Sequence, residues 1–143
     1  MATINDIMSA LKTRFEYIQP SNGFDMSVKF VQLGPITIEI ERLKLPAIAI
    51  QNQPEELLVA GKTNNRYSTI CDLFLLVRDN DALHDSINSL ISDIKKLIYD
   101  SLENYLTSYC LRVLYRSSDP DIIVNGGIAT ALVTVEIIWY EVK

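Results

Sequence analysis

Residues 129–142 read ATALVTVEIIWYEV. Up to Trp139 the odd-numbered positions are all small, branched or aromatic apolar residues, whereas the even-numbered positions mix polar and apolar side chains. This alternation predicts a β-strand with one face in a core and an amphipathic second face. Fourteen residues of strand span about 45 Å, and a compact domain of this length is only about 35–40 Å across. The strand therefore either bends at a bulge or reaches the rim of the domain, where another chain can meet it.

Five further stretches have strand character and are separated by turn residues. The first two form a predicted β-hairpin that turns through LGP at residues 33–35. Pro46 precedes the third stretch, and proline is tolerated at the start of a strand. The fourth is apolar on both faces, which is typical of a strand covered on both sides. The five stretches are Ser27–Gln32, Ile36–Glu41, Ala47–Gln51, Tyr67–Arg78 and Cys110–Arg116.

Two amphipathic helices complete the pattern. The first has Thr3 or Asn5 available as its N-cap, and its apolar stripe consists of Ile4, Ile7, Met8, Leu11 and Phe15. The second follows DND at residues 79–81, which offers N-caps. Its stripe begins at Leu83 and continues in pattern to Leu106, so the sequence leaves open whether residues 81–107 form one long helix or two.

These elements predict an α+β fold, with two or three helices packed on a mainly antiparallel or mixed β-sheet of about five or six strands. The 143 residues are expected to form a single domain, residues 1–143. A chain of this length buries about 70% of its unfolded surface, so it is expected to fold without a disulfide or a structural metal.

Composition argues against several classes of function. The net charge of −5 and the scattered basic residues give no electrostatic footprint for binding nucleic acid. Arg112 and Arg116 share one strand face and are expected to pair with a strand neighbour such as Glu136. Cys71 and Cys110 lie in apolar runs, as expected for reduced, buried cysteines of a cytosolic protein. No secretory signal is visible, and no apolar run approaches the length of a membrane span.

No catalytic constellation stands out in the sequence. The single histidine, His84, lies in the first turn of the second predicted helix beside Asp85, where we expect a solvated surface histidine. An enzyme using His84 with Asp85 or Asp81 is a third hypothesis, which full function of a His84→Ala variant would remove. Ser92 and Lys95 match the Ser-x-x-Lys pattern, but such matches arise by chance on the polar flank of an amphipathic helix.

Two aspartate pairs are compatible with a hard cation, Asp79 with Asp81 and Asp119 with Asp121. A helix cap accounts for the first pair and a turn for the second. No glycine-rich phosphate-binding pattern is present. We therefore predict a protein that is not an enzyme and that uses no cofactor and no metal.

The segment Asn52–Arg66 separates two predicted strands and has turn residues on both sides of a short apolar LLVA. We predict a long polar hairpin loop here, and loops above about a dozen residues in compact domains are usually functional or disordered. Its polar, projecting side chains are the candidate partner-binding residues: Glu55, Glu56, Lys62, Asn64 and Arg66.

In its order of elements the chain resembles the tail terminator (tail completion) proteins of long-tailed bacteriophages, a family typified by the lambda U-like minor tail proteins. The resemblance covers nearly the whole chain. The features that carry it are a short N-terminal helix, a hairpin through LGP, the strand LPAIAIQ, a long polar loop, the strand STICDLFLLV, a helix after DNDALHD and the final strand IATALVTVEIIWYEV.

The resemblance implies a structural virion protein of the tail and neck, synthesised in the host cytoplasm. Such proteins form a hexameric ring that caps the tail tube, ends its polymerisation and provides the surface for head–tail joining. The implied partners are further copies of the chain, the tail tube protein, the head completion or connector proteins and, in a contractile tail, the sheath. DNA only passes through the channel, and no membrane is involved. The long loop and the mixed face of the final strand would supply the ring's interface.

A second hypothesis, from a different class, is a small cytosolic α+β module that binds a metabolite or a protein without catalytic activity. A polar residue buried in a pocket among Tyr67, Tyr115 and Tyr140 would favour this module. A stable dimer at every concentration would also favour it over a ring-forming protein.

Overall fold

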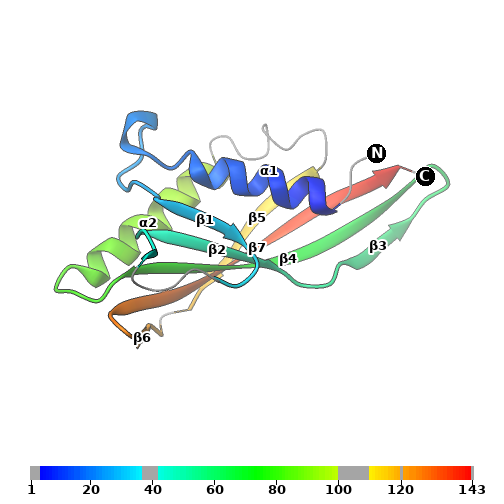
Figure 1. Cartoon of the computed structure of the whole chain (residues 1–143). Helices are drawn as coiled ribbons and strands as arrows, with labels where there is room; N and C mark the ends of the chain where they lie inside the picture. The colour runs from blue at the N-terminus through cyan, green and yellow to red at the C-terminus, as the bar shows by residue number, and fades with distance from the viewer. Residues whose placement is uncertain (1–3, 37–41, 100–109, 120, 143) are drawn as a thin grey trace.

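The computed structural model describes residues 4–36, 42–99, 110–119 and 121–142 (Figure 1). The elements are α1 (Ile4–Glu16), the 3-10 turn η1 (Pro20–Asn22), β1 (Phe30–Leu33), β2 (Ala47–Asn52), β3 (Glu56–Ala60), β4 (Asn64–Arg78), α2 (Leu83–Leu97), β5 (Cys110–Ser118), β6 (Ile123–Asn125) and β7 (Ile128–Val142). The predicted α+β fold is confirmed, because two helices pack on a mixed, mostly antiparallel sheet. The sheet has seven strands, since β3 and β6 lie in segments that we predicted to be loop and turn.

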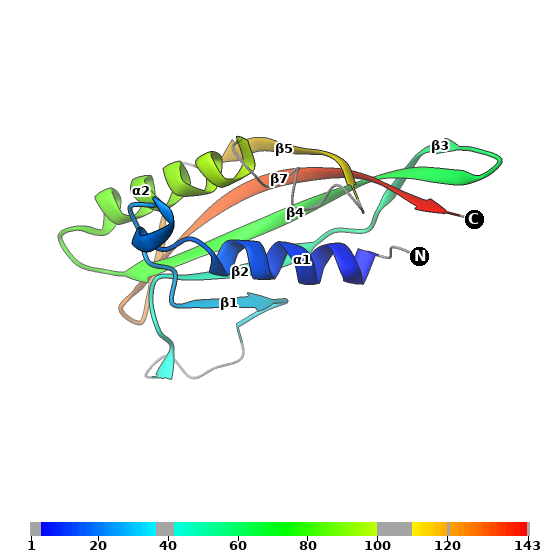
Figure 2. The ribbon, with the colours of Figure 1, turned by 90° about the horizontal axis from the view of Figure 1, so that it is seen from above.

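The sheet is built around β4 and β7, which pair antiparallel over their full 15-residue lengths without a register shift. The strand order is β1-β2-β4-β7-β5, while β3 pairs with the beginning of β4 and β6 with the beginning of β7. The final strand was expected either to bend at a bulge or to reach the rim of the domain, and it reaches the rim. β7 keeps its register along β4 and reaches the rim of the molecule, beyond the helices (Figures 1 and 2).

Both helices contribute to one core on a single face of the sheet. The odd-numbered residues of β4 from Tyr67 onward and of β7 up to Trp139 point to the side of this core, as the alternation predicts for β7. The helices bury the predicted stripes, which are Ile7, Met8, Leu11 and Phe15 of α1 and Ile87, Leu90, Ile94 and Leu97 of α2. Each such side chain stabilises the fold by about 1.5–3 kcal/mol on burial.

The opposite face of the sheet, which we call the open face, is covered differently. A small second cluster lies at one end of it and contains Leu43, Ala47 and Ile128, with Phe30, Ile36, Leu45 and Leu76 packed against them. Ile70 and Phe74 of β4 also point to this face and are only half-buried. The prediction that the β4 strand is covered on both sides is therefore correct for the helix face and only partly correct for the open face.

Two buried polar contacts join distant segments. The indole Nε1 of Trp139 donates to Thr69 Oγ1 at 3.0 Å, and the Trp139 ring stacks on Tyr67 with 4.9 Å between centroids. In α2 the Asp93 carboxylate is only 3% exposed. It accepts hydrogen bonds from the backbone N–H of Asp25 (3.0 Å) and of Met26 (2.7 Å), which fixes the segment between α1 and β1 against α2.

The helix starts differ from the predicted caps. Asn5 lies inside α1, so the prediction that it caps this helix is wrong, and Thr3 lies outside the described residues. Residues 79–81 do not cap α2, because Ala82 is the N-cap residue and makes no side-chain cap. Asn80 Oδ1 instead accepts a hydrogen bond from the N–H of Ala82 (2.9 Å) and closes the turn before the helix. Whether a second helix follows residue 99 lies outside the described residues.

The partner of β1 is β2, and the two pair in parallel. Residues 37–41, which form most of the second strand of the predicted LGP hairpin, lie outside the described residues. At the other end of the sheet a tight turn through Gly126 and Gly127 joins β6 to β7. Gly126 and Gly127 both have positive φ (62° and 81°), which a tight hairpin turn of this kind requires. None of the helices that the structure describes is long and apolar enough to span a membrane.

Candidate functional site

The segment predicted to be a polar loop is largely a β-hairpin. β3 pairs antiparallel with the first residues of β4, with a register shift next to Leu58, and the end of β7 pairs with the other side of β4. We call residues 56–68 the arm. The loop prediction is wrong for β3, which is a strand. The strand was not recognised in the sequence because all five of its residues are exposed. A strand without a buried face lacks the apolar–polar alternation from which strands are predicted, and here cross-strand pairing with β4 sets its conformation.

The arm projects from the body of the molecule. In both views of the ribbon it extends past the N-terminal end of α1 (Figures 1 and 2). The Tyr67–Trp139 stack marks the place where the main core ends and the arm begins. The tip is a tight turn in which the N–H of Gly61 donates to the carbonyl of Asn64 (2.9 Å). A Cβ at Gly61 would lie 2.4 Å from that oxygen, so the turn needs glycine there.

The arm carries large apolar side chains on its surface. Leu57, Leu58 and Val59 are 52%, 45% and 51% exposed. Among the described residues β3 pairs only with β4, so its second edge is unpaired. Soluble proteins usually protect such edges with charge, proline or a bulge, and contiguous exposed apolar residues mark interaction sites. The arm therefore has the properties of a protein-binding surface.

The structure places the five predicted partner-binding residues together on the arm or next to it, and all of them are exposed: Glu55, Glu56, Lys62, Asn64 and Arg66. The three apolar residues of β3, which lie between Glu56 and Lys62, were not predicted as part of this surface. Their signal was the short LLVA stretch inside a polar segment, which is unusual for a solvated loop.

A polar cluster lies where the arm joins the open face. The hydroxyl of Ser68 and the guanidinium of Arg116 both donate to the carboxylate of Glu136, joining β4, β7 and β5. The hydrogen bonds from Ser68 and, to a smaller extent, from Arg116 lower the pKa of Glu136. The predicted pairing of Arg116 with Glu136 is confirmed, whereas Arg112 is exposed and lies opposite Ile138.

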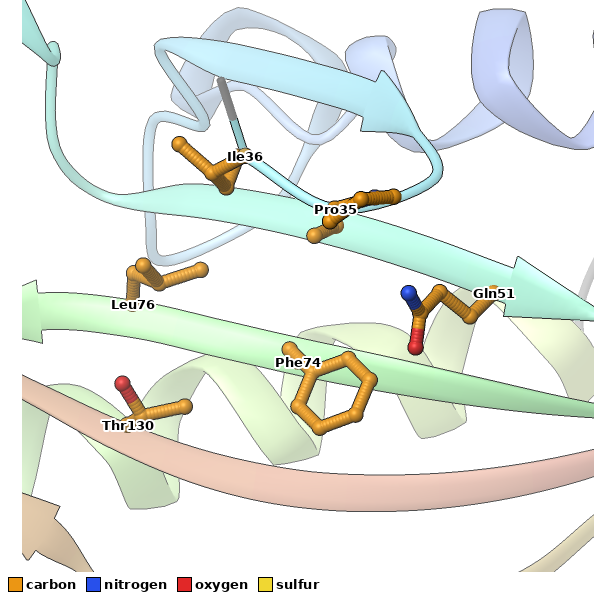
Figure 3. A pocket seen from close by; sticks show the side chains of 7 residues that line it. Pro35, Ile36, Gln51, Phe74, Leu76 and Thr130 are labelled. Carbon is orange, nitrogen blue, oxygen red and sulfur yellow. The ribbon is translucent and has the colours of Figure 1, made fainter. Parts of the chain in front are cut away.

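The open face also holds an apolar groove of about 290 Å³ (Figure 3). Strands β2, β4 and β7 form its floor, and the chain after β1 forms one side. We call this surface the groove, and it is lined by Pro35, Ile36, Ala49, Gln51, Phe74, Leu76 and Thr130. Only Gln51 and Thr130 bring polar side chains to it, so it suits an apolar side chain better than a charged ligand.

The residues considered for catalysis lie apart from these surfaces. His84 is exposed in the first turn of α2, as predicted, and Ser92 and Lys95 are exposed on the same helix. Burial, with a smaller effect of the Asp72 charge, raises the pKa of the Cys71 thiol to about 12, so it is a poor nucleophile. Within the described ranges no three His, Cys, Asp or Glu side chains are grouped as metal ligands.

The three tyrosines named for a small-molecule pocket do not share one. Tyr67 and Tyr115 lie on the helix face, where Tyr67 stacks on Trp139 and the ring of Tyr115 lies 4.8 Å from Lys95 Nζ. Tyr140 lies on the open face, opposite Arg66. The geometry that would favour a metabolite-binding module around them is therefore not found among the described residues.

The chain was also compared with known proteins. No protein-family model matches it, and no curated protein sequence matches it significantly. The features that bear on function are therefore the arm, the groove and the order of the elements.

Proposed function

We propose that the protein is a structural component of a bacteriophage tail, a tail terminator that forms a hexameric ring on the end of the tail tube. The observation that carries the proposal is the arm, which presents three exposed apolar residues beyond the helices, on a strand edge that none of the described strands pairs with. A closed ring needs a heterologous interface, in which two different patches of the same chain meet. An arm at one end of the sheet and an apolar groove on its open face are two such patches.

In this proposal the ring ends polymerisation of the tube and provides the surface for head–tail joining. Its partners are the tail tube protein, the head completion or connector proteins of the neck and, if the tail is contractile, the sheath. DNA only passes through its channel. The net charge of −5 suits a passage in which DNA must not bind, since like charges repel.

Two measurements test this function. Native mass spectrometry over a wide range of protein concentrations should show a species of six chains, or a monomer that builds one reversibly. Electron microscopy of tail tubes polymerised from the cognate tube protein should show capped ends and shorter tubes as the protein is added. Bovine serum albumin at the same concentrations is the control. Unchanged tube lengths with bare ends at saturating protein would contradict the proposal.

The second candidate function is a non-catalytic binding module, and the groove is the observation that favours it. Its volume of about 290 Å³ lies just below the range for small-molecule pockets, about 300–1,000 Å³. This function does not account for the exposed apolar residues of the arm, so we place it second. A stable dimer at every concentration, without capping of tubes, would favour the module.

A further inference from the structure

We infer that the apolar residues of the arm of one copy dock into the groove on the open face of a second copy. The inference deepens the proposed function and rests on it only in taking another copy of the same chain as the partner. It names both halves of the interface, a projecting apolar strand and an apolar hollow.

The arm cannot fill the groove of its own chain. Leu57 pairs with Tyr67, and the groove residue Phe74 lies seven positions further along β4. At about 3.4 Å per residue this is a separation of about 24 Å along the strand, several times the reach of a leucine side chain. A contact between the two surfaces must therefore join different molecules.

The two surfaces match chemically. The arm offers Leu57, Leu58 and Val59, each about half exposed. Five of the seven groove residues are apolar, and in Figure 3 the labelled Phe74 and Leu76 side chains extend over the floor strands. Leu57 and Leu58 are already about half buried, so burying the rest of either side chain strengthens association by about three- to tenfold. Burial of all three arm residues would therefore strengthen a contact between copies, against the entropic cost of association.

One set of charges beside the two surfaces is also complementary. Glu55 and Glu56 are exposed at the start of the arm. Lys44 is exposed between two leucines of the second cluster, which also contains the groove residues Ile36 and Leu76. An arm entering the groove would therefore bring carboxylates near a lysine. Charge pairs at an interface rim mainly set orientation and association rate, so this pair would help to orient the docked arm.

The contact is heterologous, because each copy gives an arm and receives another. Such a contact propagates from copy to copy and closes into a ring when the rotation between copies allows it. The competing geometry is edge-to-edge pairing of β3 with β6 of a second copy. Ile123 and Val124 of β6 are also exposed (70% and 50%), and this geometry is tested below.

Disulfide trapping tests the geometry. The full chain carrying Leu58→Cys and Gln51→Cys should form covalent species larger than a dimer under mild oxidation, visible on non-reducing gels. Each single variant, with Cys71 and Cys110 unchanged, is a control and should give at most a dimer. A chain carrying Leu58→Cys and Ile123→Cys reports the edge-to-edge geometry. The inference is overturned if only the variant with Leu58→Cys and Ile123→Cys forms covalent species larger than a dimer. It is also overturned if the variant with Leu58→Cys and Gln51→Cys forms none.

Sedimentation of substituted chains tests the energetics. Replacing Leu57 and Leu58 by serine should raise the dissociation constant for self-association at least about tenfold. The control carries Ile123→Ser and Val124→Ser, which remove two exposed apolar side chains elsewhere and should leave that constant within about twofold. Circular dichroism checks that both variants are folded. Unchanged self-association of the arm variant, or a wild-type monomer at every concentration, overturns the inference.

The tube-capping assay separates this inference from the proposed function. If the wild-type chain caps tubes and the arm variant assembles equally well, the docking inference fails while the tail terminator function stands. If arm-dependent assembly occurs but tubes are never capped, the docking inference stands and the tail terminator function fails.

Discussion

The hydrogen bond between Trp139 and Thr69 allows a sharp test of the packing at the base of the arm. It joins β7 to β4 inside the core, where the two residues are 2% and 0% exposed, and its length is 3.0 Å. The perturbation is a double-mutant cycle made of Trp139→Phe, Thr69→Val and the two combined. Each single change leaves one buried polar group without a partner, whereas the double change removes both groups.

The expected magnitudes follow from these contacts. Trp139→Phe should cost about 3 kcal/mol in the free energy of unfolding, with about 1 from the smaller ring and about 2 from the hydroxyl that it leaves unpaired. Thr69→Val should cost about 2 kcal/mol because the indole N–H then lacks an acceptor. The double variant should lose only about 2 rather than about 5 kcal/mol, with about 1 from the smaller ring and about 1 from the lost hydrogen bond, which gives a coupling of about 3 kcal/mol.

Urea unfolding followed by far-UV circular dichroism measures all four proteins, since Trp139 is the only tryptophan and fluorescence is lost with it. The control cycle combines Trp139→Phe with Val77→Ala. Val77 pairs with Ala129, ten positions along β7 from Trp139, so the two effects should add within about 0.5 kcal/mol. A coupling below about 0.5 kcal/mol between Trp139 and Thr69 would refute the reasoning that these two groups are each other's hydrogen-bond partners and that water does not replace either of them.

Three further predictions concern other groups. Asp93→Ala should lower the free energy of unfolding by about 3 kcal/mol, because alanine leaves two backbone N–H groups unpaired, and Asp93→Asn should lower it by about half as much. Urea titration of both variants measures these losses, and equal losses would contradict the prediction. Because the folded-state pKa of Glu136 lies below its usual 4.5, its contribution to stability is complete above that value and is lost as pH falls through the folded-state pKa. Melting temperatures between pH 3 and 7 should therefore fall less steeply toward acid for Glu136→Gln than for the wild type, and parallel curves would contradict this. Cys71, with its raised pKa and buried thiol, should resist iodoacetamide at pH 8 in the native protein and react in urea, as peptide mapping would show; rapid native labelling would contradict it.

The sequence predicts those elements that have one buried face. The stripe of α1, the stripe of α2 and the alternation of β7 each record the side that faces the core, and the structure buries that side. The strand after Pro46 is predicted within one residue of its observed end. In these elements local periodicity and tertiary packing agree, which is why the fold class follows from the sequence.

The elements that escaped prediction are stabilised by partners distant in sequence. β3 exposes all five of its residues, and its conformation depends on pairing with β4. The parallel partner of β1 is also a consequence of assembly, which no local pattern encodes. At the candidate site, polarity correctly led to exposed residues such as Lys62 and Arg66, but it hid the exposed apolar residues of β3. A binding strand is selected for its partner's surface, so its pattern differs from that of a core strand.

The ladder between β4 and β7 also has a consequence for how fast the chain folds. Its pairs run from Arg78 with Ile128 to Asn64 with Val142, so about fifty residues of chain or more lie between every two partners. Closing such long loops costs entropy before any pairing compensates for it. Proteins dominated by distant contacts of this kind fold in milliseconds to seconds, whereas helical bundles fold in microseconds to milliseconds. During that interval the apolar edge of β3 is already synthesised while its supporting sheet is incomplete, so a chaperone that shields exposed strands should raise the yield of assembled protein.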